Sequence, residues 1–174
     1  MKKGFTLIEL LIVIAVLAIL ATVVVLVLNP AQLLAEARDG QRFSDLAAVR
    51  DAIVYYLATA SSPTIGAAAY CTSGTTSGFN TPTCAARDLY GIDGSGWVGV
   101  NLTGATGGSP LATLPRDPSN GATYYYSYLG ENTNKTFELN AKLESTRYAT
   151  TEDKDNKDGG DNAAFYEVGS NLDL

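Results

Sequence analysis

Hydrophobic residues are concentrated at the start of the chain. Of the 24 residues from 5 to 28, 18 are Leu, Ile, Val or Phe, and the polar exceptions are Thr6, Glu9 and Thr22. As a helix with a rise of about 1.5 Å per residue, this run is about 36 Å long and exceeds the roughly 30 Å hydrocarbon core of a membrane. The pattern therefore predicts a helix that inserts into a membrane.

A second helical pattern follows a break at Asn29 and Pro30, since proline removes a backbone hydrogen bond and usually kinks a helix. Between Ala31 and about Ala60, apolar residues recur at steps of three and four, which is typical of a helix with one buried face. We expect this face to pack on a sheet; the alternative is a groove for a partner. The apolar face comprises Leu46, Val49, Ile53, Tyr56, Leu57 and Ala60, and the predicted solvent face comprises Arg38, Asp39, Arg42, Asp45, Arg50 and Asp51.

Strands are predicted in the second half of the chain. Residues 123–129 are rich in aromatic side chains, residues 130–135 form a predicted turn, and a third strand is expected at residues 165–168. Residues 136–144 alternate regularly between apolar and polar side chains, so the two kinds lie on opposite faces. The apolar face has Phe137, Leu139, Ala141 and Leu143, and the polar face has Glu138, Asn140, Lys142 and Glu144.

The pattern between these elements is irregular. The second helix should end near residues 61–63, and residues 67–110 are rich in Thr, Ser, Gly and Ala, with short elements expected near residues 85–89 and 97–100. The predicted fold class is α+β, in which a long N-terminal helix, hydrophobic in its first half and amphipathic in its second, packs on a small antiparallel β-sheet.

Composition argues against catalysis. The chain has 174 residues, no histidine and two cysteines, so His-based nucleophilic and metal chemistry is excluded. The sequence shows no nucleophile–base arrangement and no phosphate-binding glycine motif, so we predict that the protein is not an enzyme. The net charge of −6, and the lack of basic residues among the tyrosines at 124–128, favour sheet packing over nucleic-acid binding.

Neither a secretory signal nor a simple membrane anchor explains all features of the apolar segment. Its length exceeds that of a cleavable secretory signal, and Lys2 and Lys3 place the N-terminus in the cytoplasm by the positive-inside rule. Glu9 is costly inside a membrane and is therefore expected to have a partner. Arg38 is the next basic residue, so the nearer candidates are Lys2, Lys3 and an amino group made by cutting the chain near Phe5.

The N-terminal sequence KKGFTLIELLIVI, residues 2–14, resembles the class III signal of type IV prepilins and type II secretion pseudopilins. The resemblance implies that a prepilin peptidase cuts between Gly4 and Phe5 and that the new Phe5 amine is N-methylated. Cutting there would change the formal side-chain charge from −6 to −8 and place an ammonium one helical turn from Glu9. The predicted role of Phe5 and Glu9 is to pair during filament assembly.

A pilin-like fold and a structural role follow from this resemblance. The expected parts are a leader peptide (1–4), a transmembrane and filament-core helix (5–29), an amphipathic helix (30–62) and a globular head (63–174). The precursor would sit in the cytoplasmic membrane with its N-terminus in the cytoplasm and would then join a homo-oligomeric helical filament, outside the cell or in the periplasm. The implied partners are prepilin peptidase, assembly machinery, the membrane before assembly and copies of the same chain.

A second resemblance supports an alternative filament. The sequence LPRDP at residues 114–118, followed by Tyr124–Tyr126, is similar to the Leu-Pro-x-Asp-Pro loop and aromatic strand of the major pseudopilin of type II secretion. It implies a pseudopilus that serves protein secretion or the uptake of DNA in competence. The choice between a pilus and a pseudopilus therefore stays open.

Two further sites are predicted in the head. Cys71 and Cys84 would form a disulfide outside the cytoplasm, the alternative being two reduced thiols. Residues 152–162 carry five acidic side chains on a glycine-containing loop, so Asp155, Asp158 and Asp161 are candidate calcium ligands, although the EF-hand spacing is absent. Pseudopilins of the resembling kind bind calcium in a C-terminal loop; the alternative is a solvated acidic loop without a cofactor.

Overall fold

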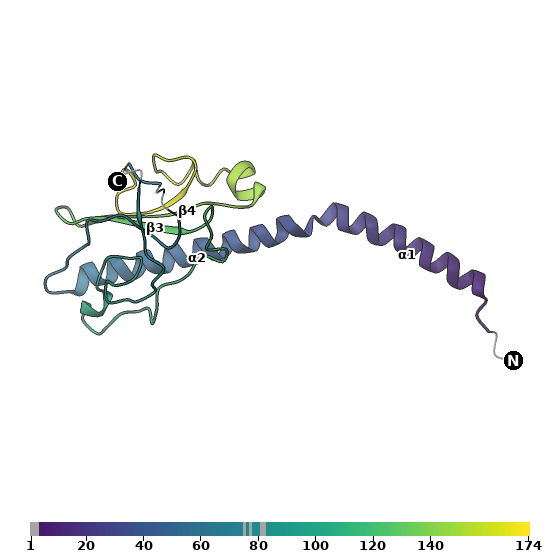
Figure 1. Cartoon of the computed structure of the whole chain (residues 1–174), viewed down its shortest axis with the longest axis horizontal. Helices are drawn as coiled ribbons and strands as arrows, with labels where there is room; N and C mark the ends of the chain where they lie inside the picture. Colours follow the sequence, from purple (N-terminus) through teal and green to yellow (C-terminus); the bar gives the residue numbers. More distant parts are fainter. Residues whose placement is uncertain (1–3, 75, 77, 81–82) are drawn as a thin grey trace.

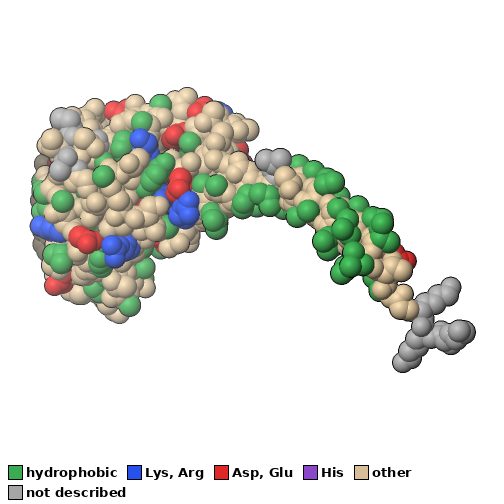
Figure 2. Space-filling model, turned by 45° about the vertical axis from the view of Figure 1, so that its right-hand side comes forward, with side chains coloured by type: hydrophobic (Ala, Val, Ile, Leu, Met, Phe, Trp, Pro, Cys, Tyr) green, Lys and Arg blue, Asp and Glu red, His purple; other side chains and the backbone are tan. Residues whose placement is uncertain are grey.

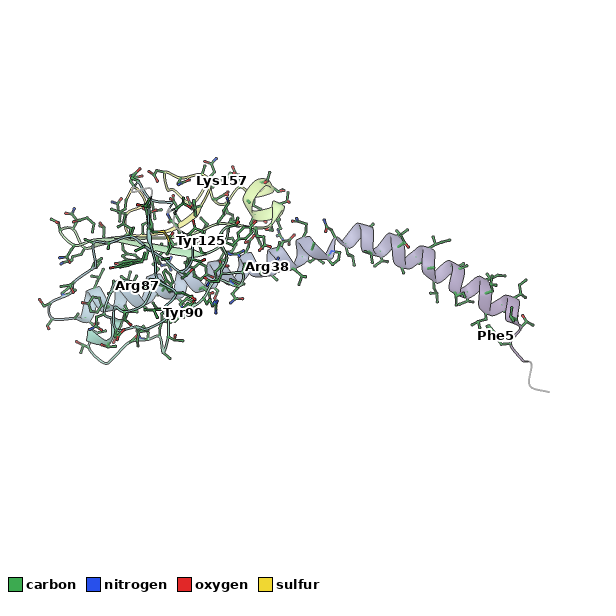
Figure 3. The ribbon with its side chains drawn as sticks, in the orientation of Figure 1. Phe5, Arg38, Arg87, Tyr90, Tyr125 and Lys157 are labelled. Carbon is green, nitrogen blue, oxygen red and sulfur yellow. A yellow bond between two sulfur atoms is a disulfide. The ribbon has the colours of Figure 1, made fainter. Side chains whose placement is uncertain are left out.

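The computed structural model describes residues 4–74, 76, 78–80 and 83–174. The leader residues Lys2 and Lys3 lie outside this part. The helix α1 (Leu7–Leu28) projects as a long stalk, and α2 (Pro30–Thr59) continues into a compact head (Figure 1). Phe5 lies at the free end of the stalk, and Arg38 lies where α2 enters the head (Figure 3).

The two helices are separated by a single residue. Asn29 has a left-handed backbone conformation with φ of 39°, which Asn tolerates better than most residues. Pro30 is the first residue of α2, where the missing N–H of proline has no helical partner to lose. The predicted interruption at Asn29 and Pro30 therefore separates two regular helices.

The head contains a five-stranded sheet with the order β2-β1-β3-β4-β5. The central β3 pairs antiparallel with β1 and β4, β4 pairs antiparallel with β5, and β1 and β2 pair in parallel. A long helix against this mostly antiparallel sheet confirms the predicted pilin-like α+β class. The strands are β1 (Tyr70–Cys71), β2 (Ala85–Ala86), β3 (Tyr126–Glu131), β4 (Thr136–Ala141) and β5 (Tyr166–Gly169).

The predicted strand bounds are partly wrong. β3 begins three residues later than the aromatic run and includes Gly130 and Glu131, which were expected in the turn. The reason is a tight turn before the strand, in which the Gly121 N–H donates to the Tyr124 carbonyl at 2.9 Å, so the residues before Tyr126 bend away from the sheet. β4 also ends earlier than predicted, at Ala141.

The main core lies between α2 and one face of the sheet. Leu46, Val49 and Ile53 are buried there, so the expectation that this helix face packs on a sheet is confirmed. From the sheet come Tyr126, Tyr128, Phe137 and Leu139, and from the preceding irregular segment come Trp97, Val98, Val100 and Leu102. The expectation of a regular element at residues 97–100 is wrong, because these residues fill the core from a loop whose Trp97 indole donates to the Pro115 carbonyl at 3.0 Å.

The predicted solvent face of α2 is wrong at two positions. Asp39 and Arg42 are both completely buried. The Arg42 guanidinium binds both carboxylate oxygens of Asp117, at 2.7 and 3.0 Å, and an Asp39 oxygen at 2.8 Å. Asp39 also accepts the backbone N–H groups of Glu144 and Ser145, so this network joins α2 to the 114–118 loop and to the segment that follows β4.

Cys71 and Cys84 form the predicted disulfide, with their Cα atoms 5.7 Å apart. The bond joins β1 to the segment leading into β2, and Tyr125 packs against both cysteines. β1 and the edge strand β2 have two residues each, so the cross-link is a large part of what holds this side of the sheet in place.

Replacing both cysteines with serine, as in C71S/C84S, should therefore destabilise the head. A loop of this length is expected to contribute about 3 kcal/mol through the reduced entropy of the unfolded chain. Denaturant unfolding of the full chain in detergent measures the difference. An unchanged unfolding midpoint would show that the disulfide does not limit the stability of this edge.

Candidate functional site

The stalk exposes its apolar side chains. Every large apolar side chain described in α1 is at least 45 % exposed, and Phe5 is 76 % exposed. Hydrophobic side chains gather along the projecting helix, whereas the head surface mixes hydrophobic, polar and charged side chains (Figure 2). Within the described residues, one helix, starting at Leu7, is long and apolar enough to cross a membrane. Such a surface requires lipid or other apolar helices around it.

Glu9 caps the start of this helix. The Thr6 backbone N–H and hydroxyl donate to Glu9 Oε2 at 2.9 and 2.6 Å, and the Glu9 N–H donates to the Thr6 hydroxyl at 3.3 Å. This reciprocal capping box satisfies two backbone N–H groups that have no partner within the helix. The role of Thr6 was not predicted from the sequence, although the spacing Thr-x-x-Glu is the signal for a capping box.

The predicted processing site precedes the helix. Gly4 and Phe5 are non-helical and exposed, and no atom lies within 4 Å of the position that a Gly4 Cβ would occupy. In the uncut chain the Phe5 nitrogen is a peptide amide, and the Glu9 carboxylate is bound to Thr6 instead. Cleavage after Gly4 and pairing of Phe5 with Glu9 stay predictions.

The candidate calcium residues do not converge. Asp158 uses both carboxylate oxygens to accept the backbone N–H groups of Gly160 and Glu167. Asp155 is mostly buried, and burial raises the pKa of its carboxyl group, whereas Asp161 is exposed. The described residues contain no group of three or more Asp, Glu or Cys side chains placed to hold a metal ion. Calcium binding by this loop stays a prediction.

The α+β head and the exposed apolar stalk fit a membrane-anchored precursor. Residues 1–25 match the family model described as the prokaryotic N-terminal methylation motif. The chain therefore carries the class III signal of type IV pilins and pseudopilins, as the first resemblance indicated. No curated protein and no solved structure matches the chain.

Proposed function

We propose that this chain is a structural subunit of a type IV pilus-like filament. It is made as a membrane-anchored prepilin, cut after Gly4 by prepilin peptidase and polymerised through α1. The observation that carries this proposal is the combination of an N-terminal methylation motif with an apolar helix of 22 residues that projects, uncovered, from a folded head.

The physical argument concerns the surroundings of α1. In the precursor, lipid covers the apolar side chains of the helix. When the subunit leaves the bilayer, the α1 helices of neighbouring copies replace the lipid, so the apolar surface never enters water. Repetition of one contact between identical chains then gives a helical filament.

A pseudopilus for protein secretion or DNA uptake is the second candidate. The LPRDP loop at residues 114–118 favours it, and Asp117 in this loop is the residue that anchors the head to Arg42 of α2. Both candidates share the cut after Gly4 and assembly through α1. They differ in the length and location of the filament.

The proposed function is tested at the mature N-terminus. Mass spectrometry of the chain isolated from cells with a prepilin peptidase should find a protein that begins at an N-methylated Phe5. A Gly4→Val variant should keep its leader, whereas Gly40→Val, at an equally open glycine within α2, should be cut normally. An anchored ligand-binding module would instead retain Met1, and that result would refute the proposal.

Electron microscopy then separates the two filament types. Long surface filaments that disappear when the chain is deleted indicate a pilus. Short structures confined to the cell envelope, together with a defect in protein secretion or DNA uptake, indicate a pseudopilus.

A further inference from the structure

The outermost strands of the sheet are β2 and β5, and each has backbone groups that point away from the sheet. In β2, the N–H group of Ala85 donates inward to a backbone carbonyl of the β1 segment at 2.9 Å, and the N–H group of Arg87 does the same at 2.7 Å. Ala86, between them, therefore directs its N–H and C=O outward. Ala86 is exposed, and these two groups bind no described residue.

The β5 edge on the opposite side of the sheet has the same property. The Ser170 N–H donates inward to the Phe137 carbonyl of β4 at 3.0 Å, so strand alternation turns Glu167 and Gly169 outward. The Asp158 carboxylate already accepts the Glu167 N–H at 2.7 Å. Gly169 keeps an N–H and a C=O on the outer side that bind no described residue.

The free backbone groups of the two edges are complementary. The strand pairings make β2 and β5 run in opposite directions, so a second copy placed beside the first in the same orientation brings its β2 antiparallel to β5. In an antiparallel ladder, two residues directly opposite each other exchange both of their N–H···O=C bonds. Ala86 of one copy and Gly169 of the next can form such a pair, since each presents one donor and one acceptor.

Side chains beside the two edges fit the same contact. Leu89 follows β2 in the chain and is 55 % exposed. A surface cavity of about 250 Å³ extends along β5 and is lined in part by Arg50 and Leu172. The exposed Asp88 precedes Leu89 and is opposite in charge to Arg50. The β2 edge therefore offers an apolar side chain and a negative charge to a cavity that has an apolar wall and a positive charge.

We propose that successive copies of this chain join their heads edge to edge, β2 of one copy against β5 of the next, with Leu89 in the cavity beside β5. This inference rests on the proposed function, because a two-residue strand is too short to hold two free chains together. In a filament, packing of α1 keeps neighbouring heads at a high local concentration, so a short contact suffices. The edges lie on opposite sides of one sheet, so the contact repeats without closing, as a helical filament requires.

The test is disulfide cross-linking in filaments sheared from cells. The variant Leu89→Cys/Leu172→Cys keeps the native bond between Cys71 and Cys84. Mild oxidation should link its copies into a ladder of dimers, trimers and larger species on a non-reducing gel. Leu89→Cys/Thr133→Cys is the matched control and should stay monomeric, because Thr133 is exposed but lies in the turn between β3 and β4.

The single variants distinguish other arrangements of the heads. Leu89→Cys and Leu172→Cys should each stay monomeric, and dimers from Leu172→Cys alone would mean that two β5 edges meet, which would overturn the proposal. Filaments of the double variant that give no ladder would also overturn the head contact, but would leave the proposed function intact. If the wild-type chain forms no filaments, the proposed function itself is refuted and the head contact with it.

A backbone variant gives a second readout that needs no added cysteine. Ala86→Pro removes the outward N–H, and proline is tolerated at a sheet edge where that N–H binds nothing in its own chain. The yield of sheared filaments should fall about fivefold, the effect of one lost hydrogen bond. Ala86→Ser keeps the N–H and should assemble normally, and both variants should melt like the wild type in detergent. A wild-type yield from folded Ala86→Pro would contradict the strand pairing.

Discussion

A chain with Glu9 replaced by alanine is expected to insert into the membrane and to be cut after Gly4, but to form few or no filaments. After cleavage, the Phe5 ammonium lies one helical turn from residue 9. In the apolar filament core, removing the carboxylate leaves that ammonium without a partner, and an uncompensated buried charge costs about 3 kcal/mol or more. A loss of this size lowers the equilibrium constant for adding a subunit more than a hundredfold.

Three variants separate the effect of the Glu9 charge on assembly from the effect of the helix cap. Glu9→Gln retains a residue that can complete the capping box but removes the negative charge, so it should fail like Glu9→Ala. Thr6→Ala removes the cap and leaves the charge, and should assemble better than either. Thr22→Ala is the matched control, because the Thr22 hydroxyl only donates to the Ala18 carbonyl of its own helix.

The measurements are the yield of sheared filaments and the mass of the membrane-bound N-terminus. Wild-type filament yield from Glu9→Ala would contradict the pairing of Glu9 with the Phe5 amine. An uncut N-terminus in Glu9→Ala would instead show that Glu9 is needed for cleavage after Gly4.

The features that the sequence predicted well depend on local pattern. A long apolar run is enough to predict α1, and Asn29 and Pro30 are enough to predict the interruption between α1 and α2. The regular alternation in β4 put Phe137 and Leu139 on the core face without any knowledge of the partner strands. Glu9 stood out because a carboxylate in an apolar run is costly wherever the run lies.

The features that were missed depend on partners distant in sequence. Arg42 and Asp39 looked like surface residues because a charged side chain on a helix is usually solvated, and Asp117, which binds Arg42, follows 75 residues later. Alternation in β4 placed Glu138 and Asn140 on the second face of the sheet, but it carried no information on the loops that cover this face. The burial of these two polar side chains was therefore not predictable from the sequence pattern.

Replacing Arg42 with alanine is expected to lower the free energy of unfolding of the head by about 3–5 kcal/mol. The change leaves the buried carboxylates of Asp39 and Asp117 without their cation, and breaking a buried pair from one side costs this much. Burial lowers the pKa of Arg42, but the hydrogen bonds and charges of Asp117 and Asp39 together raise it by more. The net shift is upward, so the guanidinium stays charged. Denaturant unfolding of the full chain in detergent measures the loss.

The control is Arg50→Ala, also on α2. Arg50 pairs with Asp51 at 2.8 Å, but their side chains are 43 % and 69 % exposed, and such a solvent-accessible pair contributes about 0–1 kcal/mol. Arg42→Lys should recover only part of the lost stability, since an ammonium cannot bind both Asp117 oxygens in the planar geometry of a guanidinium.

A double-mutant cycle then distinguishes the ion pair from simple packing. Arg42→Met keeps most of the buried volume, and Asp117→Asn removes one unpaired charge. If charge pairing dominates, the double variant should be more stable than the sum of the two single losses implies, by at least about 1 kcal/mol. Additive losses would mean that Arg42 acts mainly by filling space, and that the 114–118 loop is held to α2 by its apolar contacts rather than by Asp117.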